Sequence, residues 1–222
     1  MVLRIITGTV LMLLMAPGGY AADSVTDLAL RAAPPANSEQ KSSLKVAVIA
    51  FEDARPISSV NPDHQPRIGL RTQIGGDTTY YHVKDGPIGA AVAQTLATAL
   101  KQRGMDAWVV QAGDGRSEQS ADVTIRGQVL DFWAHANSRS GSTRLTAKVD
   151  LAVETMNHEY KSDRSSNVRK IVASKGQQDE TFYRAADLEK LLNATLNSTF
   201  AKYFENMVIE QDQIRIRRAA LP

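Results

Sequence analysis

The sequence predicts an α+β protein: a two-layer sandwich in which two helices pack on one face of a mixed sheet that includes an antiparallel meander. Three observations support this fold class. One apolar run is typical of a buried strand, later segments alternate between polar and apolar residues, and two segments carry apolar residues at helical spacing. The order of these segments is typical of a sheet with its helices on one side.

Residues 44–51 (LKVAVIAF) form the first expected strand, because an unbroken apolar and β-branched run suits a strand that is buried on both faces. The stretch 52–77 is rich in proline, glycine and charge, and we expect a long loop there. Residues 78–83 (TTYYHV) predict a short strand at the end of this loop.

A helix is expected to begin after Gly86 and Pro87 and to end at Gly104. Lys101 and Arg103 lie in its last turn, where cations interact favourably with the helix dipole. Its apolar face follows a spacing of three and four residues: Ile88, Ala91, Val92, Thr95, Leu96, Ala99 and Leu100.

The middle of the chain predicts a meander. Residues 105–111 suggest a strand, and residues 121–129 and 145–153 alternate polar and apolar residues around a turn at 137–142, which predicts an antiparallel hairpin. The alternation shifts at residues 130–133, where we expect a bulge. Residues 167–173 predict the third strand of the meander.

Residues 188–208 hold helical spacing and predict a long amphipathic helix on the sheet. The domain organisation follows from these elements. We expect a signal peptide at 1–21, a flexible linker at 22–43, one α+β domain at 44–210, and a basic tail at 211–222.

The first residues carry the pattern of a cleaved export signal. Arg4 precedes an apolar run of about 12 residues, which is shorter than the roughly 20 that span a bilayer as a helix. Small residues at Gly19 and Ala21 suit a signal peptidase, so we expect cleavage after Ala21 or Ala22 and a periplasmic location. The alternative is an uncleaved membrane anchor.

Composition limits the classes of function. Hydrophobic residues make up 43% of the chain and charged residues 23%, as in ordinary globular domains. The net charge of +2 gives no electrostatic reason to expect a nucleic-acid partner. The absence of cysteine excludes disulfides and a lipidated cysteine, so any contact with a membrane would be peripheral or through a partner.

No motif in the sequence indicates catalysis, a cofactor or a metal site, and we predict that the chain is not an enzyme. It has no cysteine nucleophile, and its glycine-rich pairs lack phosphate-loop spacing. The four histidines do not share metal-ligand spacing: His64, His82, His135 and His158.

The most distinctive polar cluster comprises Asp53 and Arg55, just after the first strand, and Arg71 across the loop. Asp53 and Arg55 lie two residues apart and can pair across a turn, and Arg71 could join them. The three residues would then form either a structural clamp or a recognition patch on an exposed loop. We favour the clamp, and the patch is the tentative binding site.

Several of these features together resemble the YajG-type family of bacterial envelope lipoproteins, over about residues 44–208. The similar features are the first strand running into Asp53-x-Arg55, Ile68-Gly69 with Arg71, the helix that ends at residues 103–104, and the long closing helix. The resemblance implies an envelope protein without established enzymatic activity. Members carry a lipid on an N-terminal cysteine, which this sequence lacks.

The leading hypothesis is therefore a non-catalytic periplasmic protein that binds another envelope component, either a protein or a glycan. The alternative is a carrier of lipids or small molecules in trans-envelope transport. A carrier needs an apolar groove, and the hypotheses differ in whether Leu192, Phe200 and Phe204 are buried or line an open cavity.

Overall fold

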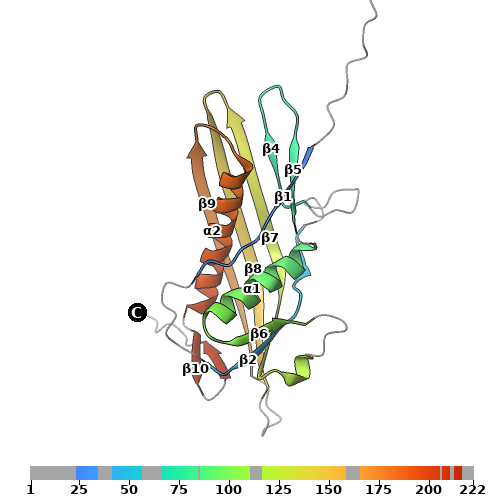
Figure 1. Cartoon of the computed structure of the whole chain (residues 1–222), viewed down its shortest axis with the longest axis vertical. Helices are drawn as coiled ribbons and strands as arrows, with labels where there is room; N and C mark the ends of the chain where they lie inside the picture. The colour runs from blue at the N-terminus through green and yellow to red at the C-terminus, as the bar shows by residue number, and fades with distance from the viewer. Residues whose placement is uncertain are drawn as a thin grey trace, which may run out of the picture.

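The computed structural model describes residues 24–34, 42–56, 67–84, 86–110, 117–158, 166–205, 207–210 and 213–216. Figure 1 shows an elongated molecule in which two helices lie in front of a curled sheet. The elements are β1 (Ser24–Leu28), β2 (Lys45–Val48), β3 (Glu52–Asp53), β4 (Gly69–Thr72), β5 (Thr79–Val83), α1 (Ile88–Gln102), β6 (Asp106–Val109), the 3-10 turn η2 (Glu118–Ser120), β7 (Val123–Arg139), β8 (Ser142–Asn157), β9 (Ser166–Glu180), α2 (Ala185–Phe204), β10 (Met207–Glu210) and β11 (Gln213–Ile216).

The predicted meander is confirmed and is longer than expected. Strands β7, β8 and β9 pair antiparallel over 15 to 17 residues each. The register shifts between Val129 and Asp131, where the change in alternation predicted a bulge. The turn between β7 and β8 is confined to residues 140–141, with Gly141 at φ +80°, a conformation that favours glycine.

The other half of the sheet contains parallel pairs, which confirms a mixed sheet with two helices. β2 pairs parallel with both β6 and β7, and the central path runs β1-β5-β4-β7-β2-β6. The expected buried strand over 44–51 ends at Val48, and the chain then bends so that Phe51 donates its backbone N–H to Gly89 O at 3.1 Å. The expected loop 52–77 instead contains β3 and β4.

Both helices bury the faces predicted for them. The apolar stripe of α1 is buried, and Gly104 takes φ +86° just beyond its end. α2 ends at Phe204, four residues earlier than predicted, because the chain turns into β10. Lys170 on β9 donates from Nζ to the carbonyls of Lys202 and Glu205 and thereby caps this end of α2.

The first half of the predicted linker differs from the expectation. Residues 24–34 form an N-terminal arm that crosses the molecule beside α2 (Figure 1), and its strand β1 pairs in parallel with β5. Leu28 is 1% exposed in the core, and Leu30 and Ala32 pack against the core. Part of the stretch that was expected to be a flexible linker is therefore docked through alternate apolar residues.

The arm is held along α2 by a ladder of side-chain bonds, which we call the amide ladder (Glu189, Asn193 and Asn197). These residues recur every four positions on α2, a rise of about 6.0 Å that nearly matches the roughly 6.6 Å between alternate residues of an extended chain. The three side chains accept from the backbone N–H groups of Ala29, Arg31 and Ala33 over 2.8 to 3.0 Å. The two asparagine amides also donate to the carbonyls of Ala29 and Arg31 at 2.9 Å.

We expected the α+β domain to end at residue 210 and a basic tail to begin at residue 211, but this boundary lies between two paired strands. β10 and β11 pair antiparallel, so part of the predicted basic tail is folded. Ile214 is 1% exposed, and the side-chain amide of buried Asn157 on β8 bonds both its N–H and its carbonyl at 2.9 Å. Arg217 and Arg218 of the predicted tail lie outside the described residues, as does the predicted signal peptide.

Candidate functional site

Asp53 and Arg55 form the pair that the sequence predicted. Arg55 Nε and Nη2 each donate to a different oxygen of the Asp53 carboxylate at 2.8 Å, a bidentate geometry. Arg55 Nη1 also donates to the backbone carbonyls of Arg67 at 2.9 Å and Phe132 at 3.3 Å. The guanidinium therefore ties three separate chain segments together.

The burial of this pair is unequal. The Arg55 side chain is 1% exposed, whereas that of Asp53 is 29% exposed. The hydrogen bonds from Arg55 hold the pKa of the Asp53 carboxyl below its usual value, although burial alone would raise it. Because Arg55 has almost no accessible surface, the geometry is that of a structural clamp, and Arg55 cannot contact a partner without moving.

Arg71 does not join the clamp. Its Nε donates to Ser138 Oγ at 3.2 Å, and its guanidinium lies 4.1 Å from the centre of the Tyr183 ring. The Tyr183 hydroxyl in turn bonds the Tyr81 hydroxyl, and burial raises the pKa of both phenols. The three predicted site residues thus divide between two places in the fold.

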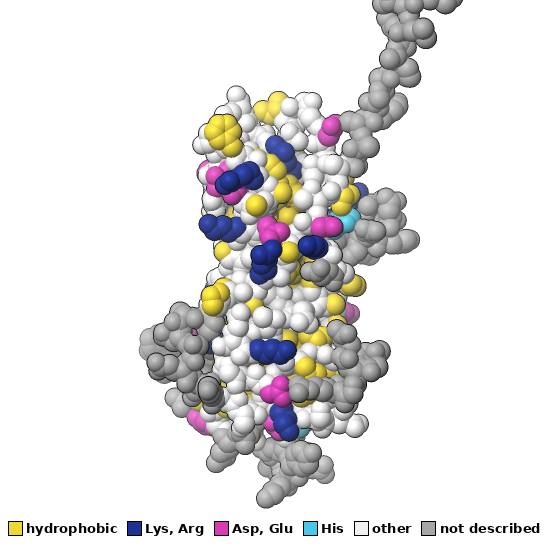
Figure 2. All heavy atoms as spheres, in the orientation of Figure 1, with side chains coloured by type: hydrophobic (Ala, Val, Ile, Leu, Met, Phe, Trp, Pro, Cys, Tyr) yellow, Lys and Arg dark blue, Asp and Glu magenta, His cyan; other side chains and the backbone are white. Residues whose placement is uncertain are grey.

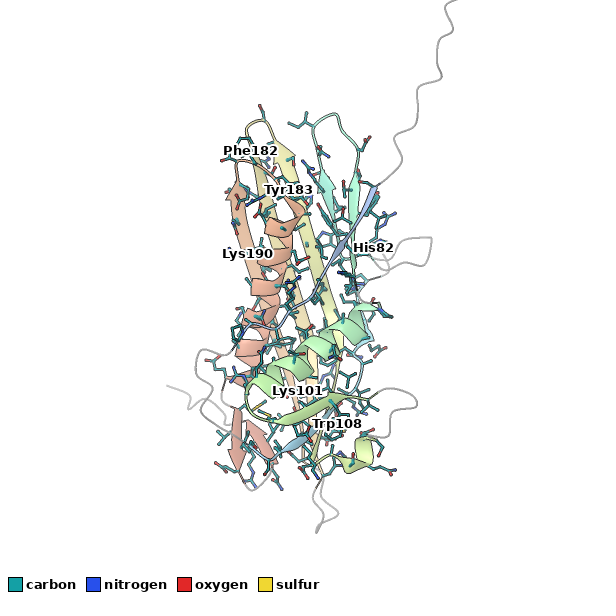
Figure 3. All side chains as sticks on the ribbon, in the orientation of Figure 1. His82, Lys101, Trp108, Phe182, Tyr183 and Lys190 are labelled. Carbon is teal, nitrogen blue, oxygen red and sulfur yellow. The ribbon has the colours of Figure 1, made fainter. Side chains whose placement is uncertain are left out.

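This second cluster lies near one end of the molecule. Figure 3 shows Tyr183 and its neighbour Phe182 at the start of α2, beside the β4–β5 and β7–β8 turns. Phe182 is 83% exposed. The sequence did not associate Arg71 with Tyr183, because the two residues are more than 100 positions apart and only the sheet brings them together.

The histidines are dispersed in the structure. His135 bonds Thr72 Oγ1 at 3.2 Å and His158 bonds Thr124 Oγ1 at 2.8 Å, while His64 lies outside the described residues. Burial lowers the pKa of His135. In the described ranges, no group of three or more His, Cys, Asp or Glu side chains is placed to hold a metal ion.

The outer side of the meander is a polar surface that carries two cavities. α2 packs against the opposite side of β8 and β9, and both helices contact β7, where the buried residues lie. The side chains of the outer side, which we call the open face, alternate with those core residues. They include Arg126, Gln128, Asp131, Trp133, His135, Thr146, Lys148, Asp150, Glu154, Arg169, Ile171, Lys175 and Gln177.

One cavity on the open face is polar and has a volume of about 370 Å³. Arg126 Nε donates to Glu154 Oε2 at 2.9 Å across its lining, and Arg169 donates to Gln128 Oε1 at 3.2 Å. Gln128 continues this network by donating to Glu52 at 2.8 Å. Its charged groups are mostly paired with each other, so the cavity does not present a single sign of charge.

A second cavity on the open face, of about 260 Å³, lies beside Trp133. Thr146, Lys148, Lys175 and Gln177 line it together with the half-buried indole. Lys148 donates to two carboxylates, Asp131 at 2.6 Å and Asp150 at 2.9 Å, and these bonds raise its pKa. An aromatic surface flanked by hydrogen-bonding groups is typical of recognition sites.

Sequence reasoning missed the Trp133 site. The sequence pattern that could have indicated it is the alternation of polar and apolar residues along the meander, because the polar residues lie on the solvent-exposed side of the sheet. The shift at residues 130–133 hid the position of Trp133, because the side to which each residue points depends on how the bulge is placed.

The residues that were to distinguish a carrier are mostly in the core. Leu192 is 0% exposed and Phe200 2%, but Phe200 and the partly buried Phe204 both line a cavity, in which the Arg103 guanidinium lies 4.1 Å from the Phe204 ring centre. This cavity between the helices and the arm measures about 260 Å³, and a second apolar cavity beside Leu30 about 290 Å³. Both are smaller than the polar cavity of about 370 Å³ on the open face.

Charge on the helix-covered side is mixed. Figure 2 shows Lys and Arg side chains interspersed with Asp and Glu side chains on this side, without a large area of one sign among the described residues. In the part of the chain that is described, no helix combines the length and the apolar character needed to cross a membrane.

No protein-family model matches the sequence, and a search of curated proteins finds no match. Among solved structures, a Xanthomonas campestris protein of the DUF330 family is similar over 81% of this chain and 92% of its own, with 12% identity and a TM-score of 0.47. A homologue of neuraminyllactose-binding hemagglutinin from Helicobacter pylori is similar over 82% and 91%, with 11% identity and a TM-score of 0.40.

A PelC dodecamer from Paraburkholderia phytofirmans is similar over 70% of this chain and 86% of its own, with 12% identity and a TM-score of 0.33. At these identities and TM-scores, the similarities assign neither a family nor an activity to the chain. The resemblance to YajG-type proteins accordingly stays a prediction.

Proposed function

We propose that this chain is a non-catalytic binding protein of the bacterial envelope, which is exported to the periplasm and receives another envelope component on its open face. The export pattern of the first 21 residues supports the compartment. The Trp133 cavity supports the binding role, because a half-buried indole beside lysine, threonine and glutamine side chains offers both contact area and hydrogen bonds.

The open face suits a macromolecule better than a small substrate. Its cavities are shallow features of a long sheet surface, with Ile171 66% exposed between them. A protein or a glycan can contact many such groups at once, and a few central side chains then carry most of the binding energy. Trp133 is the residue that we expect to have this role.

Two of the carboxylates are poorly suited to act as general acids. Asp53 and Glu154 both have pKa values lowered by an arginine partner, which keeps them ionised and engaged. A general acid near neutral pH needs the opposite shift. The carrier alternative has weaker support, because Leu192 is buried and the cavity that Phe200 and Phe204 line measures only about 260 Å³.

The first test is in-cell crosslinking of the exported chain, followed by capture and mass spectrometry of protein and glycan fractions. We expect one dominant envelope partner for the wild type and at least a tenfold loss of it for Trp133→Ala, since a central aromatic residue contributes on the order of 2 kcal/mol or more. Lys175→Glu, which is exposed and changes no core contact, should also weaken capture.

Phe182→Ala provides the matched control, because it removes an exposed aromatic ring at the end of the molecule, away from the open face. Each variant must keep the melting temperature of the wild type within a few degrees. If Trp133→Ala and Lys175→Glu capture the partner as well as the wild type does, the open face is not the binding site. Capture of lipid or small molecules alone would favour the carrier.

A further inference from the structure

Strand β9 lies at the edge of the sheet (Figure 1), and within the described residues it pairs only with β8. His158 donates its N–H to Asp122 O, which fixes the hydrogen-bonded pairs of β7 and β8. Successive residues of a strand bond opposite neighbours, so the even-numbered residues of β8 bond β7 and its odd-numbered residues bond β9. Leu151 of β8 pairs with Val172 of β9, so the even-numbered residues of β9 bond β8. The odd-numbered residues of β9 therefore direct their N–H and carbonyl groups towards the free edge.

Among the described residues, this edge is long, and charged side chains are its main protection. Natural proteins usually blunt a free edge with a short strand, charged residues such as lysine, a proline, a bulge or a covering segment. β9 is 15 residues long and contains no proline. Lys202 on α2 donates from Nζ to the outward carbonyl of Ala173, and this flexible side chain can move aside. Ile171 is 66% exposed on the same strand.

Charge along β9 runs from basic to acidic. Arg169, Lys170 and Lys175 lie towards its start and middle, and Asp179 and Glu180 form its end. A strand with opposite charge at its two ends complements a second copy that runs in the opposite direction. We propose that β9 pairs antiparallel with β9 of a second copy of this chain, about a two-fold axis at Ser174, to give a symmetric dimer.

Only odd-numbered residues of β9 present their N–H and carbonyl groups at the free edge, so two copies of β9 can pair only in registers that place odd-numbered residues opposite each other. An axis at Ser174 places Arg169 opposite Asp179 of the second copy, twice per dimer by symmetry. An axis at Lys175 would oppose two lysines, which is unfavourable, and an axis at Ala173 would place Arg169 opposite Gln177. Only the Ser174 register among these three pairs opposite charges on the outer side.

Asp179 and Arg169, the two charged residues of the proposed pair, can each form one more hydrogen bond. Asp179 accepts from Arg144 through Oδ1 at 3.1 Å, which leaves Oδ2 for Arg169 of the second copy. Arg169 donates to Gln128 through Nη2 only, in the bonds of the described residues. These side chains lie on the open face, so the dimer would join two open faces into one continuous surface with a Trp133 site on each half.

The inner side next to the axis is also compatible with close approach. Ser174 Oγ donates to Ser198 Oγ on α2 at 3.3 Å, so α2 presents a small residue beside the proposed axis. Ala194, one turn earlier on the same helical face, is exposed and small as well. Lys202, one turn later on this face, bonds the carbonyl of Ala173 and would have to move aside for the second copy, whereas Ser198 and Ala194 leave room for its helix.

Sedimentation velocity of the full exported chain over a wide concentration range tests the proposal. We expect a monomer–dimer equilibrium for the wild type. Arg169→Glu and Asp179→Arg should each raise the dissociation constant at least tenfold, because like charges then oppose each other twice per dimer. The double variant Arg169→Glu/Asp179→Arg should recover the wild-type constant, since it reverses both members of each pair.

Ala173→Pro is a second, independent variant. It removes an outward N–H and leaves the bonds to β8 intact, so it should abolish the dimer while the melting temperature changes little. Phe182→Ala, at the end of the molecule, should leave the dissociation constant unchanged. A wild type that stays monomeric, a double variant without recovery, or a dimer that survives Ala173→Pro would each overturn the proposal.

Discussion

Replacing Arg55 by alanine is expected to lower the free energy of unfolding by about 3 kcal/mol, the lower end of the range for breaking a buried ion pair. The lower end applies because Asp53 is 29% exposed and water can solvate it once the guanidinium is gone. The carbonyls of Arg67 and Phe132 would also lose their donor. For a chain of this size the change corresponds to a fall in melting temperature of roughly 6–12 °C.

Arg55→Lys provides the matched control for the geometry of the clamp. Lysine keeps the charge but cannot donate to both Asp53 oxygens and to two carbonyls from a planar fork, so we expect a smaller loss of stability. Thermal and urea unfolding measure both variants. If Arg55→Ala keeps full stability but loses partner capture, the pair is a recognition patch and the clamp interpretation fails.

The clamp also predicts a dependence of stability on pH. The pKa of Asp53 is lower in the folded protein than its ordinary value, so its contribution is present above that ordinary value and is lost as the pH falls through the folded pKa. We expect Asp53→Asn to be less stable than wild type at neutral pH and the difference to shrink in acid. A difference that is constant with pH would contradict this origin.

Removing the two asparagines of the amide ladder is expected to release the N-terminal arm while the rest of the domain stays folded. Asn193→Ala/Asn197→Ala deletes four bonds to the backbone of the arm. At about 1 kcal/mol each, less some replacement by water, the loss is roughly 3 kcal/mol. The amides of Arg31 and Ala33, which the ladder accepts, should then exchange their hydrogens about a hundredfold faster.

Asn167→Ala, which changes the same residue type at an exposed position on β9, is the matched control and should not alter exchange in the arm. Trypsin gives a second readout, because the Arg31 side chain is 74% exposed but its backbone is bonded to α2 in the folded arm. Cleavage after Arg31 should accelerate in the double variant. Unchanged exchange and cleavage would show that Leu28 and the β1–β5 pairing hold the arm without the ladder.

The ladder shows how tertiary structure gives a role to residues that the helical pattern alone places on the helix surface. Asn193 and Asn197 fall within a helical pattern, and by position alone they are polar residues on its surface. Only the packed structure places an extended chain beside them. Their spacing matches that of the arm, but the sequence does not specify which segment will lie there.

Local patterns determined much of the architecture. The stripe of α1, the alternation in β7 and β8, and the break at residues 130–133 each arise from the period of one element, and each appears in the structure. The pairing of Asp53 with Arg55 was likewise predictable, because two residues in a turn are within reach whatever the rest of the chain does.

Contacts between distant segments were decided only by the tertiary structure. Arg71 pairs with Ser138 and Tyr183 because β4 lies beside β7 and the start of α2, and nothing within a few residues of Arg71 indicates either partner. The arm and the Trp133 site depend in the same way on which surfaces the core leaves exposed. Periodicity determines which side of an element is apolar, whereas the free energy of packing the whole chain determines what that side meets.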